Sequence, residues 1–281
     1  MTDPVPAIAF QGMPGAYSDL AARSAFPNLA PLPCHTFEQA MEAVHSGAAA
    51  LGMLPCENSL AGRVPDIHSL LPGSGLSIVG EHFQRVEHCL LGVPGAAVAD
   101  IRRIHSHAVA LGQVRSILQE LGADAVVEAD TAGSAKLVAD WGRREDAAIA
   151  SSLAAEIYGL QVLRTNVEDA THNTTRFYVL AREKRAASAD TAGLMTTFVF
   201  RVRNIPAALY KALGGFATNG VNMSRLESYM LHGEFTATQF LADVDGHPDQ
   251  PALSRALEEL RFFTAESRIL GTYPRAAFRD R

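Results

Sequence analysis

The stretch SHAVALGQVRSILQELGADAVVEADTAGSAKLVADWGRREDAAIASS, residues 106–152, decides the fold class because helical and extended patterns alternate along it. Its first part predicts one long helix, with Ser106 as the N-cap and Gly122 as the stop. The apolar stripe of this helix consists of Leu111, Val114, Leu118 and Leu121.

The rest of the stretch repeats the same alternation. Val126–Val127 and Ala147–Ala150 are predicted strands, and Ser151–Ser152 begins a further helix. Between them, Thr131 is the predicted cap of a helix whose buried face carries Leu137, Val138 and Trp141. This order predicts a mostly parallel sheet, arranged as two α/β lobes.

Toward the N-terminus the pattern continues. Ala7–Phe10 is a predicted buried strand, and Ala16–Phe26 a helix that follows Gly12–Gly15. Thr36 and Gln39 have capping-box spacing at the start of a helix that Gly47 ends. The other predicted strands are 48–54, followed by the loop 55–59, and 76–79, 89–93 and 174–180.

Toward the C-terminus, the polar stretch REKRAASADTAG (182–193) lacks apolar periodicity and predicts a linker. Beyond it the predicted order is β-α-β-β-α-β, the ferredoxin-like motif. Its helices begin near Pro206 and at Pro251. Its strands are 195–203, 223–231, 235–244 and 268–272, with the turn His232–Gly233 between the second and third.

Composition limits the class of protein. A chain of 281 residues, 48% apolar and 19% charged, has room for two globular domains. The net charge of −6 argues against a nucleic-acid partner. The three cysteines lack CxxC spacing, which indicates reduced thiols and neither a disulfide framework nor a zinc site. Neither a signal peptide nor an apolar run of membrane-spanning length is present, so we expect a cytoplasmic protein without a membrane partner.

Four polar clusters follow a strand or begin a helix, the positions where open α/β sheets bind ligands. Free N–H groups at helix starts favour an anionic ligand, although plain helix capping explains each cluster taken alone. The first cluster, GMPGAYS, matches neither a P-loop nor GxGxxG, so nucleotide binding is weakly supported. The clusters are 12–18, 57–62, 106–107 with 130–132, and 173–177.

The sequence Thr175–Arg176–Phe177 carries the sharpest chemical prediction. The planar fork of Arg176 suits a carboxylate, and the hydroxyl of Thr175 can donate a hydrogen bond to a leaving group. Phe177 would exclude water, whereas an edge strand with an exposed arginine is the equally weighted alternative. Histidine pairs such as His105–His107 lack further ligands nearby, so no metal is predicted.

Seven stretches in this order resemble the prephenate dehydratase family with a C-terminal ACT domain. They are GMPGAYS (12–18), PCENSLAGRV (55–64), HCL (88–90), SHAVALGQ (106–113), DTAGSA (130–135), AAIASSLAAEIYGL (147–160) and NTTRF (173–177). The family pattern SHPQA is SHAVA here, so its Pro-Gln pair is missing.

The resemblance implies a two-lobed fold like that of periplasmic binding proteins, with the active site in the interlobe cleft. Lobe one would be 1–82 with 166–181 and lobe two 83–165, within a catalytic domain of 1–182. A linker at 183–193 and an ACT domain at 194–275 would follow. The family reaction converts prephenate to phenylpyruvate with loss of water and carbon dioxide, and needs no cofactor.

The resemblance also assigns roles to residues. Catalytic roles fall on Thr175, Arg176, Glu57, Asn58 and Ser59. Substrate-binding roles fall on Ser106, Thr131, Phe177, Asn173 and Ser18. An arogenate dehydratase and a non-catalytic amino-acid-binding regulator are the alternatives.

Feedback by L-phenylalanine at paired ACT domains is also implied, in a homodimer or homotetramer. The effector-binding residues would be Ala207, Ala208, Leu209, Asn222, Glu227 and Ser228. The usual GAL motif is AAL here, and the usual ESRP is ESYM, which puts the affinity for phenylalanine in question.

Overall fold

The computed structural model describes residues 5–185, 187–203, 205–230 and 237–280. The chain divides into two compact units, which are described separately. The first contains Met1–Val64 and His82–Phe177, and the second contains Pro65–Glu81 and Tyr178–Arg281. In the described part of the chain, no helix combines the length and the apolar character that crossing a membrane requires.

The first sheet has the strand order β2-β1-β3-β11-β5, with β4 paired to β3, and β1 runs parallel to both β2 and β3. Two helices, α1 (Tyr17–Ala25) and α2 (Phe37–His45), accompany it. The strands are β1 (Ala7–Gln11), β2 (Ala30–Cys34), β3 (Leu51–Asn58), β4 (Gly62–Arg63), β5 (Ser77–Arg85) and β11 (Thr174–Ala181).

Local sequence explains most of this sheet. Ile8 and Phe10 are fully buried on β1, and the Thr36 side chain caps α2 by accepting from Gln39 N, as predicted. The predicted loop at 55–59 is wrong for most of its length. β3 continues to Asn58, and the chain returns as β4, because the Glu57↔Arg63 and Asn58↔Gly62 pairs extend the ladder.

The second sheet has the order β10-β6-β9-β7-β8. β7 is parallel to β8 and β9, but β6 is antiparallel to β9 and β10, so the expected mostly parallel arrangement is wrong for this sheet. The strands are β6 (Cys89–Gly92), β7 (Arg103–His107), β8 (Asp124–Glu128), β9 (Asp146–Ala150) and β10 (Gln161–Arg164).

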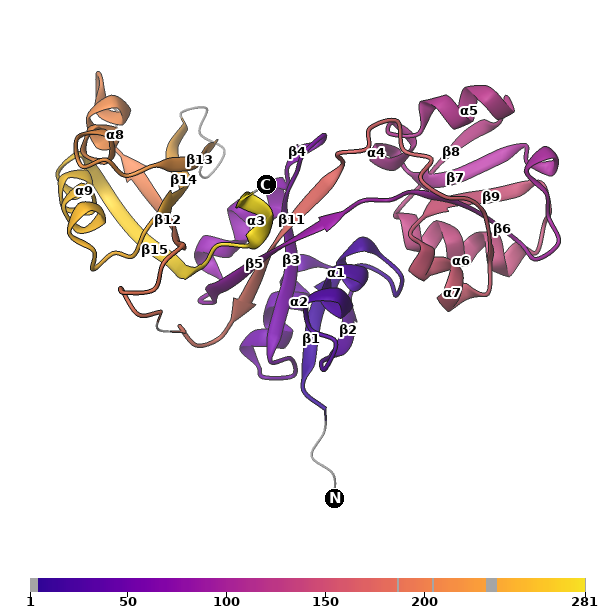
Figure 1. Cartoon of the computed structure of the whole chain (residues 1–281), viewed down its shortest axis with the longest axis horizontal. Helices are drawn as coiled ribbons and strands as arrows, with labels where there is room; N and C mark the ends of the chain where they lie inside the picture. The colour runs from indigo at the N-terminus through magenta and orange to yellow at the C-terminus, as the bar shows by residue number, and fades with distance from the viewer. Residues whose placement is uncertain (1–4, 186, 204, 231–236, 281) are drawn as a thin grey trace. The chain divides into compact units, whose positions relative to one another are not determined.

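Helices cover both faces of the second sheet (Figure 1). α6 (Thr131–Trp141) and α7 (Ser152–Tyr158) pack on the face that carries Leu91 and Ala148, and α4 (Ala108–Leu111) and α5 (Arg115–Leu121) on the face that carries Leu90 and Ile149. The alternation of side chains along each strand therefore divides the core into two layers. A short 3-10 turn, η2 (Val98–Asp100), precedes β7.

Three sequence predictions in this region are corrected. Ser106 lies inside β7, and the His107 side chain caps the helix, which is broken into α4 and α5 because Val114 leaves helical geometry. Asp130, rather than Thr131, caps α6 by accepting from Gly133 N. Trp141 is 38% exposed, so it does not belong to the buried face.

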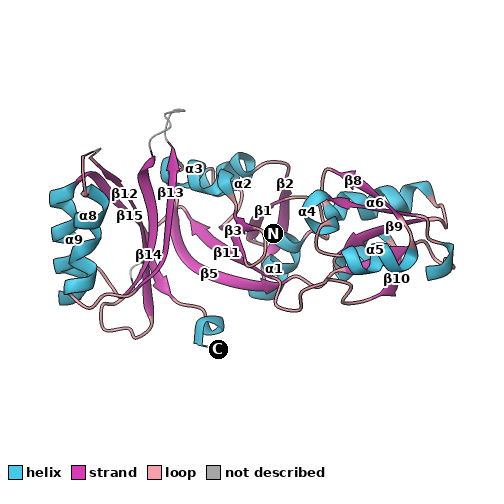
Figure 2. Ribbon diagram, turned by 90° about the horizontal axis from the view of Figure 1, so that it is seen from above, coloured by secondary structure: helices cyan, strands magenta, loops and turns pink. Residues whose placement is uncertain are grey.

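In the second unit, a four-stranded antiparallel sheet has the order β13-β14-β12-β15 (Figure 2). α8 (Ala208–Thr218) and α9 (Pro251–Phe263) lie side by side on one face over a core of aromatic rings, among them Phe198, Phe200 and Phe216. The strands are β12 (Leu194–Val202), β13 (Met223–Met230), β14 (Ala237–Asp245) and β15 (Thr264–Pro274).

The predicted ferredoxin-like order is therefore confirmed, with Pro251 in the first turn of α9. Pro206 precedes α8 instead of lying in its first turn, because Ala207 is the N-cap. The predicted turn His232–Gly233 lies outside the described residues. The second unit also holds α3 (Pro65–Leu70) and the short helices η1 (Leu71–Gly73) and η3 (Ala277–Asp280).

Candidate functional site

Asn58, the last residue of β3, is the centre of a polar cluster in the first unit. Its Nδ2 donates to Asn173 Oδ1 at 2.8 Å, to the Thr174 carbonyl at 3.3 Å and to Thr175 Oγ1 at 2.9 Å. Its Oδ1 accepts from two backbone amides, Leu60 N at 3.0 Å and Ala61 N at 2.8 Å. Asn58 therefore uses Nδ2 to hold the start of β11 and Oδ1 to hold the turn that follows β3.

The bond from Asn58 determines what Thr175 has left to offer. A hydroxyl has one proton and two acceptor lone pairs, and the amide of Asn58 occupies one of the lone pairs. The Thr175 proton is therefore not consumed by this contact and remains for a ligand. Thr175 is the second residue of β11 and is partly exposed.

Asn173 extends the cluster toward residues that flank the second sheet. It is fully buried, and its Nδ2 donates to Gln113 Oε1 at 2.9 Å. Gln113 Oε1 lies 3.0 Å from His88 Nε2, and His88 Nδ1 lies 2.8 Å from the hydroxyl of Tyr17, which is also 3.0 Å from the carbonyl of Glu87. A continuous chain of side chains thus runs from Tyr17 in α1 to Thr175 in β11.

Burial sets the protonation of the groups at the far end of this chain. It lowers the pKa of His88 below its usual value, although Gln113 and Glu168 oppose the shift. It also raises the pKa of Tyr17 well above its ordinary value, and Cys89 and Glu168 add to that. Near neutral pH both side chains are therefore uncharged. The same burial raises the pKa of Cys89 to about 11, which keeps this thiol protonated and a poor nucleophile.

Arg176 and Glu57 form an ion pair beside this cluster. Arg176 Nη1 lies 3.8 Å from Glu57 Oε2, and the Arg176 residue is only 3% exposed. The Glu57 side chain is 38% exposed, so the carboxylate is the more accessible partner. Ser59 is held tightly, since its Oγ donates to the His172 carbonyl and accepts from Thr174 N, both at 3.0 Å.

Only some of the predicted substrate-binding residues lie in the polar cluster. Asn173 belongs to the cluster, whereas the Ser106 hydroxyl is fully buried and donates to the Ile149 carbonyl at 2.7 Å. Ser18 is 8% exposed in α1, Phe177 is 1% exposed in β11, and Thr131 is the first residue of α6.

Sequence reasoning did not select Tyr17, His88 or Gln113, which the structure joins to the cluster. All three fall inside the stretches that carry the family resemblance. Their position in these stretches is the feature of the sequence that could have indicated a role at the site. The sequence neighbour of His88, Cys89, would point to the other face of a strand, whereas the hydrogen-bond partners of His88 come from distant segments.

The residues predicted to bind an effector lie in the second unit. Ala207 has a left-handed φ of 61°, and Ala208 is 6% exposed at the start of α8, where Leu209 follows. Asn222 Nδ2 donates to Asp245 Oδ2 at 3.0 Å. On β13, Glu227 lies 3.9 Å from Arg225 Nε, and Ser228 is its neighbour.

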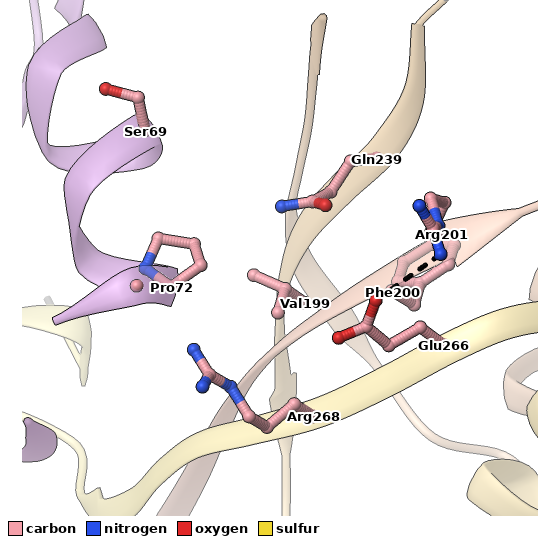
Figure 3. Close-up of a pocket in the computed structure, with 9 residues that line it drawn as sticks. Ser69, Pro72, Val199, Phe200, Arg201, Gln239, Glu266 and Arg268 are labelled. Carbon is pink, nitrogen blue, oxygen red and sulfur yellow. Dashed lines mark ion pairs between the residues drawn. The ribbon is translucent and has the colours of Figure 1, made fainter. Parts of the chain in front are cut away.

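A separate pocket of about 280 Å³ lies within the second unit, between the α3–η1 segment and the four-stranded sheet (Figure 3). Arg201 and Glu266 pair across its wall at 3.6 Å, and Val199 lines it. It contains none of the predicted site residues, so we do not assign the dehydratase chemistry to it. Among the described residues, no group of three or more His, Cys, Asp or Glu side chains is arranged to hold a metal ion.

Comparison with known proteins identifies close relatives. The family model described as prephenate dehydratase matches residues 8–185. The bifunctional N-acyl-homoserine lactone acylase/prephenate dehydratase of Komagataeibacter europaeus is 66% identical over 272 residues, which cover 97% of each chain. The arogenate dehydratase/prephenate dehydratase 1 of Arabidopsis thaliana is 38% identical over 95% of this chain and 71% of the relative. The crystal structure of the prephenate dehydratase of Arthrobacter aurescens in complex with L-Phe is 31% identical, with a TM-score of 0.86 over 96% of this chain and 90% of that one.

Proposed function

The chain belongs to the prephenate dehydratase family, and we propose that Thr175 donates a hydrogen bond to the hydroxyl group that leaves prephenate. The enzyme is a lyase that converts prephenate to phenylpyruvate with loss of water and carbon dioxide. Aromatisation supplies the driving force, so the protein mainly has to orient the substrate and stabilise the departing oxygen.

The observation that carries this proposal is the 2.9 Å bond from Asn58 Nδ2 to Thr175 Oγ1. An amide that donates to the threonine oxygen polarises the O–H bond and makes the hydroxyl a better donor. It also restrains the Thr175 side chain, which limits the directions in which its hydroxyl can donate. The rest of the cluster keeps Asn58 itself in position.

The negative charges of the substrate need partners as well. Prephenate has two carboxylates, and Arg176 is the cation that follows Thr175 on β11. Its pair with Glu57 is long, at 3.8 Å, and Glu57 is the more exposed partner. We propose that a substrate carboxylate takes the place of Glu57 at the guanidinium, which avoids leaving a buried charge without a partner.

Replacement of the Thr175 hydroxyl tests the mechanism. Thr175→Val keeps the shape of the side chain and should lower kcat by about 10²-fold or more, with KM nearly unchanged. Thr174→Val is the matched control, because the Thr174 side chain donates to the His172 carbonyl, at 3.3 Å, and not to the Asn58 amide. Wild-type kcat in Thr175→Val would refute the assignment.

The choice between prephenate and arogenate is a finer question. The two substrates differ in a keto group and an amine, and a plant relative is named for both activities. We propose prephenate as the preferred substrate, because the bacterial relative at 66% identity is named a prephenate dehydratase and not an arogenate dehydratase. Measurement of kcat/KM for both substrates decides this, and a higher value with arogenate contradicts it.

We also propose that L-phenylalanine regulates the enzyme through the second unit. The relative from Arthrobacter aurescens was solved with L-Phe bound. In this chain Arg225, two residues before Glu227 on β13, donates to the Tyr178 hydroxyl at 3.0 Å and to His68 Nε2 at 2.7 Å. Tyr178 lies on β11, three residues after Thr175, so a shift of β13 acts directly on the strand that begins at the catalytic cluster.

Regulation of this kind suits a dimer or a tetramer. β13 is an edge strand, and Leu226 and Met230 on it are 40% and 56% exposed, which favours pairing with a second copy. We expect activity to fall as L-phenylalanine is added to the full chain, and Glu227→Gln to weaken that inhibition. Light scattering measures the oligomeric state. A monomer whose activity ignores millimolar L-phenylalanine contradicts the proposal.

A second activity has support from one observation. The relative at 66% identity is named as an N-acyl-homoserine lactone acylase as well as a prephenate dehydratase. We propose that this chain also hydrolyses N-acyl-homoserine lactones. Release of homoserine lactone from a purified sample, measured by mass spectrometry, tests it, and no release under conditions where the dehydratase is active contradicts it. Thr175→Val then shows whether the two activities share a site.

A further inference from the structure

We propose that Tyr17 and His88 are positioning residues for the dehydratase reaction, and that they act on Thr175 through Gln113, Asn173 and Asn58. The inference rests on the proposed role of Thr175 as the hydrogen-bond donor to the leaving hydroxyl. It adds that the donor and acceptor order along the whole chain of side chains is fixed from the Asn58 end.

The first end is fixed by the backbone. Leu60 N and Ala61 N are unambiguous donors, and both point at the same atom of Asn58, at 3.0 and 2.8 Å. That atom has to be the amide oxygen, so the other one is the NH₂ group. The direction of the hydrogen bonds to Thr175 and Asn173 follows without further assumption.

The order then propagates to the histidine. Asn58 donates to Asn173 Oδ1, so the other Asn173 atom is an NH₂ group that donates to Gln113 Oε1. This oxygen lies 3.0 Å from His88 Nε2. An oxygen acceptor needs a proton from the ring, so His88 carries its proton on Nε2.

The tyrosine lies at the other end of the chain of side chains. A neutral imidazole that is protonated on Nε2 has a lone pair on Nδ1, and the Tyr17 hydroxyl lies 2.8 Å from Nδ1. Nδ1 therefore accepts from the Tyr17 hydroxyl, which shares its single proton between Nδ1 and the Glu87 carbonyl at 3.0 Å. The tautomer itself is set from the Asn58 end, through Gln113. In the tautomer protonated on Nδ1, a lone pair on Nε2 would face the Gln113 oxygen. A flip of the Gln113 amide would then place its NH₂ group against that of Asn173, and a flip of Asn173 would place its NH₂ group against that of Asn58.

The members of the chain come from five separate segments. Tyr17 lies in α1, His88 just before β6 and Gln113 between α4 and α5, whereas Asn58 ends β3 and Asn173 precedes β11. The hydrogen bonds join segments that flank the two sheets, so the orientation at Thr175 depends on how these segments are held together.

Two substitutions of His88 separate positioning from simple packing. A glutamine amide ends near the place of Nε2 and can still donate to Gln113. An asparagine amide ends near the place of Nδ1 and cannot reach Gln113. We expect His88→Asn to lower kcat by about tenfold or more with KM within about threefold, and His88→Gln to retain kcat within about threefold of wild type.

Tyr17→Phe is the smaller perturbation, and His45→Asn is a control at an exposed histidine outside the cluster. Tyr17→Phe should lower kcat several-fold at unchanged KM. Equal losses of kcat in His88→Asn and His88→Gln overturn the proposal, as does wild-type kcat in His88→Asn. If His88→Asn fails to fold, wild-type kcat in Tyr17→Phe overturns it instead. Thr175→Val is measured in parallel. A wild-type kcat in Thr175→Val refutes the role of Thr175. A reduced kcat in Thr175→Val together with a wild-type kcat in His88→Asn refutes only the positioning role of His88 and Tyr17.

Discussion

The substitution Asn58→Asp replaces one amide nitrogen by an oxygen of similar size and so tests the cluster with little change in shape. The oxygen that accepts from Leu60 N and Ala61 N is retained. The new oxygen takes the place of Nδ2 and faces Asn173 Oδ1, the Thr174 carbonyl and Thr175 Oγ1, which lie at 2.8, 3.3 and 2.9 Å from Nδ2.

The magnitude follows from the three contacts. Asn173 Oδ1 loses its donor, whereas the Thr174 carbonyl still accepts from Ser59 N at 2.9 Å. At about 1–3 kcal/mol for one unsatisfied buried group, the free energy of unfolding should fall by about 1–3 kcal/mol. Thr175 turns its proton to the new carboxylate in a charge-assisted bond of about 1.5–3 kcal/mol. Recovering that proton for the substrate costs the same amount, which is about 10- to 100-fold in kcat at about 1.4 kcal/mol per factor of ten.

The assay is steady-state formation of phenylpyruvate over a range of pH, with urea unfolding of the same samples. Protonation of the introduced carboxyl restores one donor, so the deficit relative to wild type should shrink as the pH falls. Asn28→Asp, which adds the same charge at an exposed turn, is the control. A kcat within about twofold of wild type at neutral pH, with unchanged stability, would refute the reasoning.

Three further predictions follow from named residues. Arg176→Lys keeps the charge but loses the planar fork, so KM for prephenate should rise about tenfold, and unchanged kinetics contradict the carboxylate role. Ala207→Gly removes a left-handed non-glycine residue with φ 61°, so the free energy of unfolding in urea should rise by about 0.5–1 kcal/mol, and a decrease contradicts this. The bonds from Arg103 and His105 hold the pKa of Asp146 below its usual value, so its contribution to stability is present above the unfolded pKa near 3.8 and is lost as the pH falls through the folded value. Arg103→Gln should therefore make stability less dependent on pH in the acid range, and identical pH dependence in urea unfolding contradicts the assignment.

The sequence by itself determined the elements whose signals are local. The capping pair Thr36–Gln39, the stop at Gly122 and the proline that opens α9 each act within one helical turn, so their effect is visible in a few neighbouring residues. The same is true of the β-α-β-β-α-β order in the second unit, because each of its elements has its own period. The motif NTTRF also drew attention to Thr175 and Asn173, which the structure joins through Asn58, without any knowledge of the fold.

Only the tertiary structure decided the elements that depend on distant partners. Pro31 and Pro33 argue against a strand, yet β2 forms at the edge of its sheet, where a missing N–H is tolerated. Ser106 is of a residue type that often caps helices, but it lies in β7, where it pairs with Val127 on β8. Pairing across a sheet outweighs a local cap signal when the residue is fully buried.

The cluster around Thr175 shows the same division. The sequence determined which residue types were available, since Asn58, Asn173 and Thr175 are all polar and lie in conspicuous stretches. Only the fold decided that Asn58 meets Asn173 across 115 positions of sequence, and that Tyr17 meets His88 across 71. A hydrogen bond requires its two atoms within about 3 Å and in line. No local pattern encodes that condition, because it is met only when separate segments have packed together.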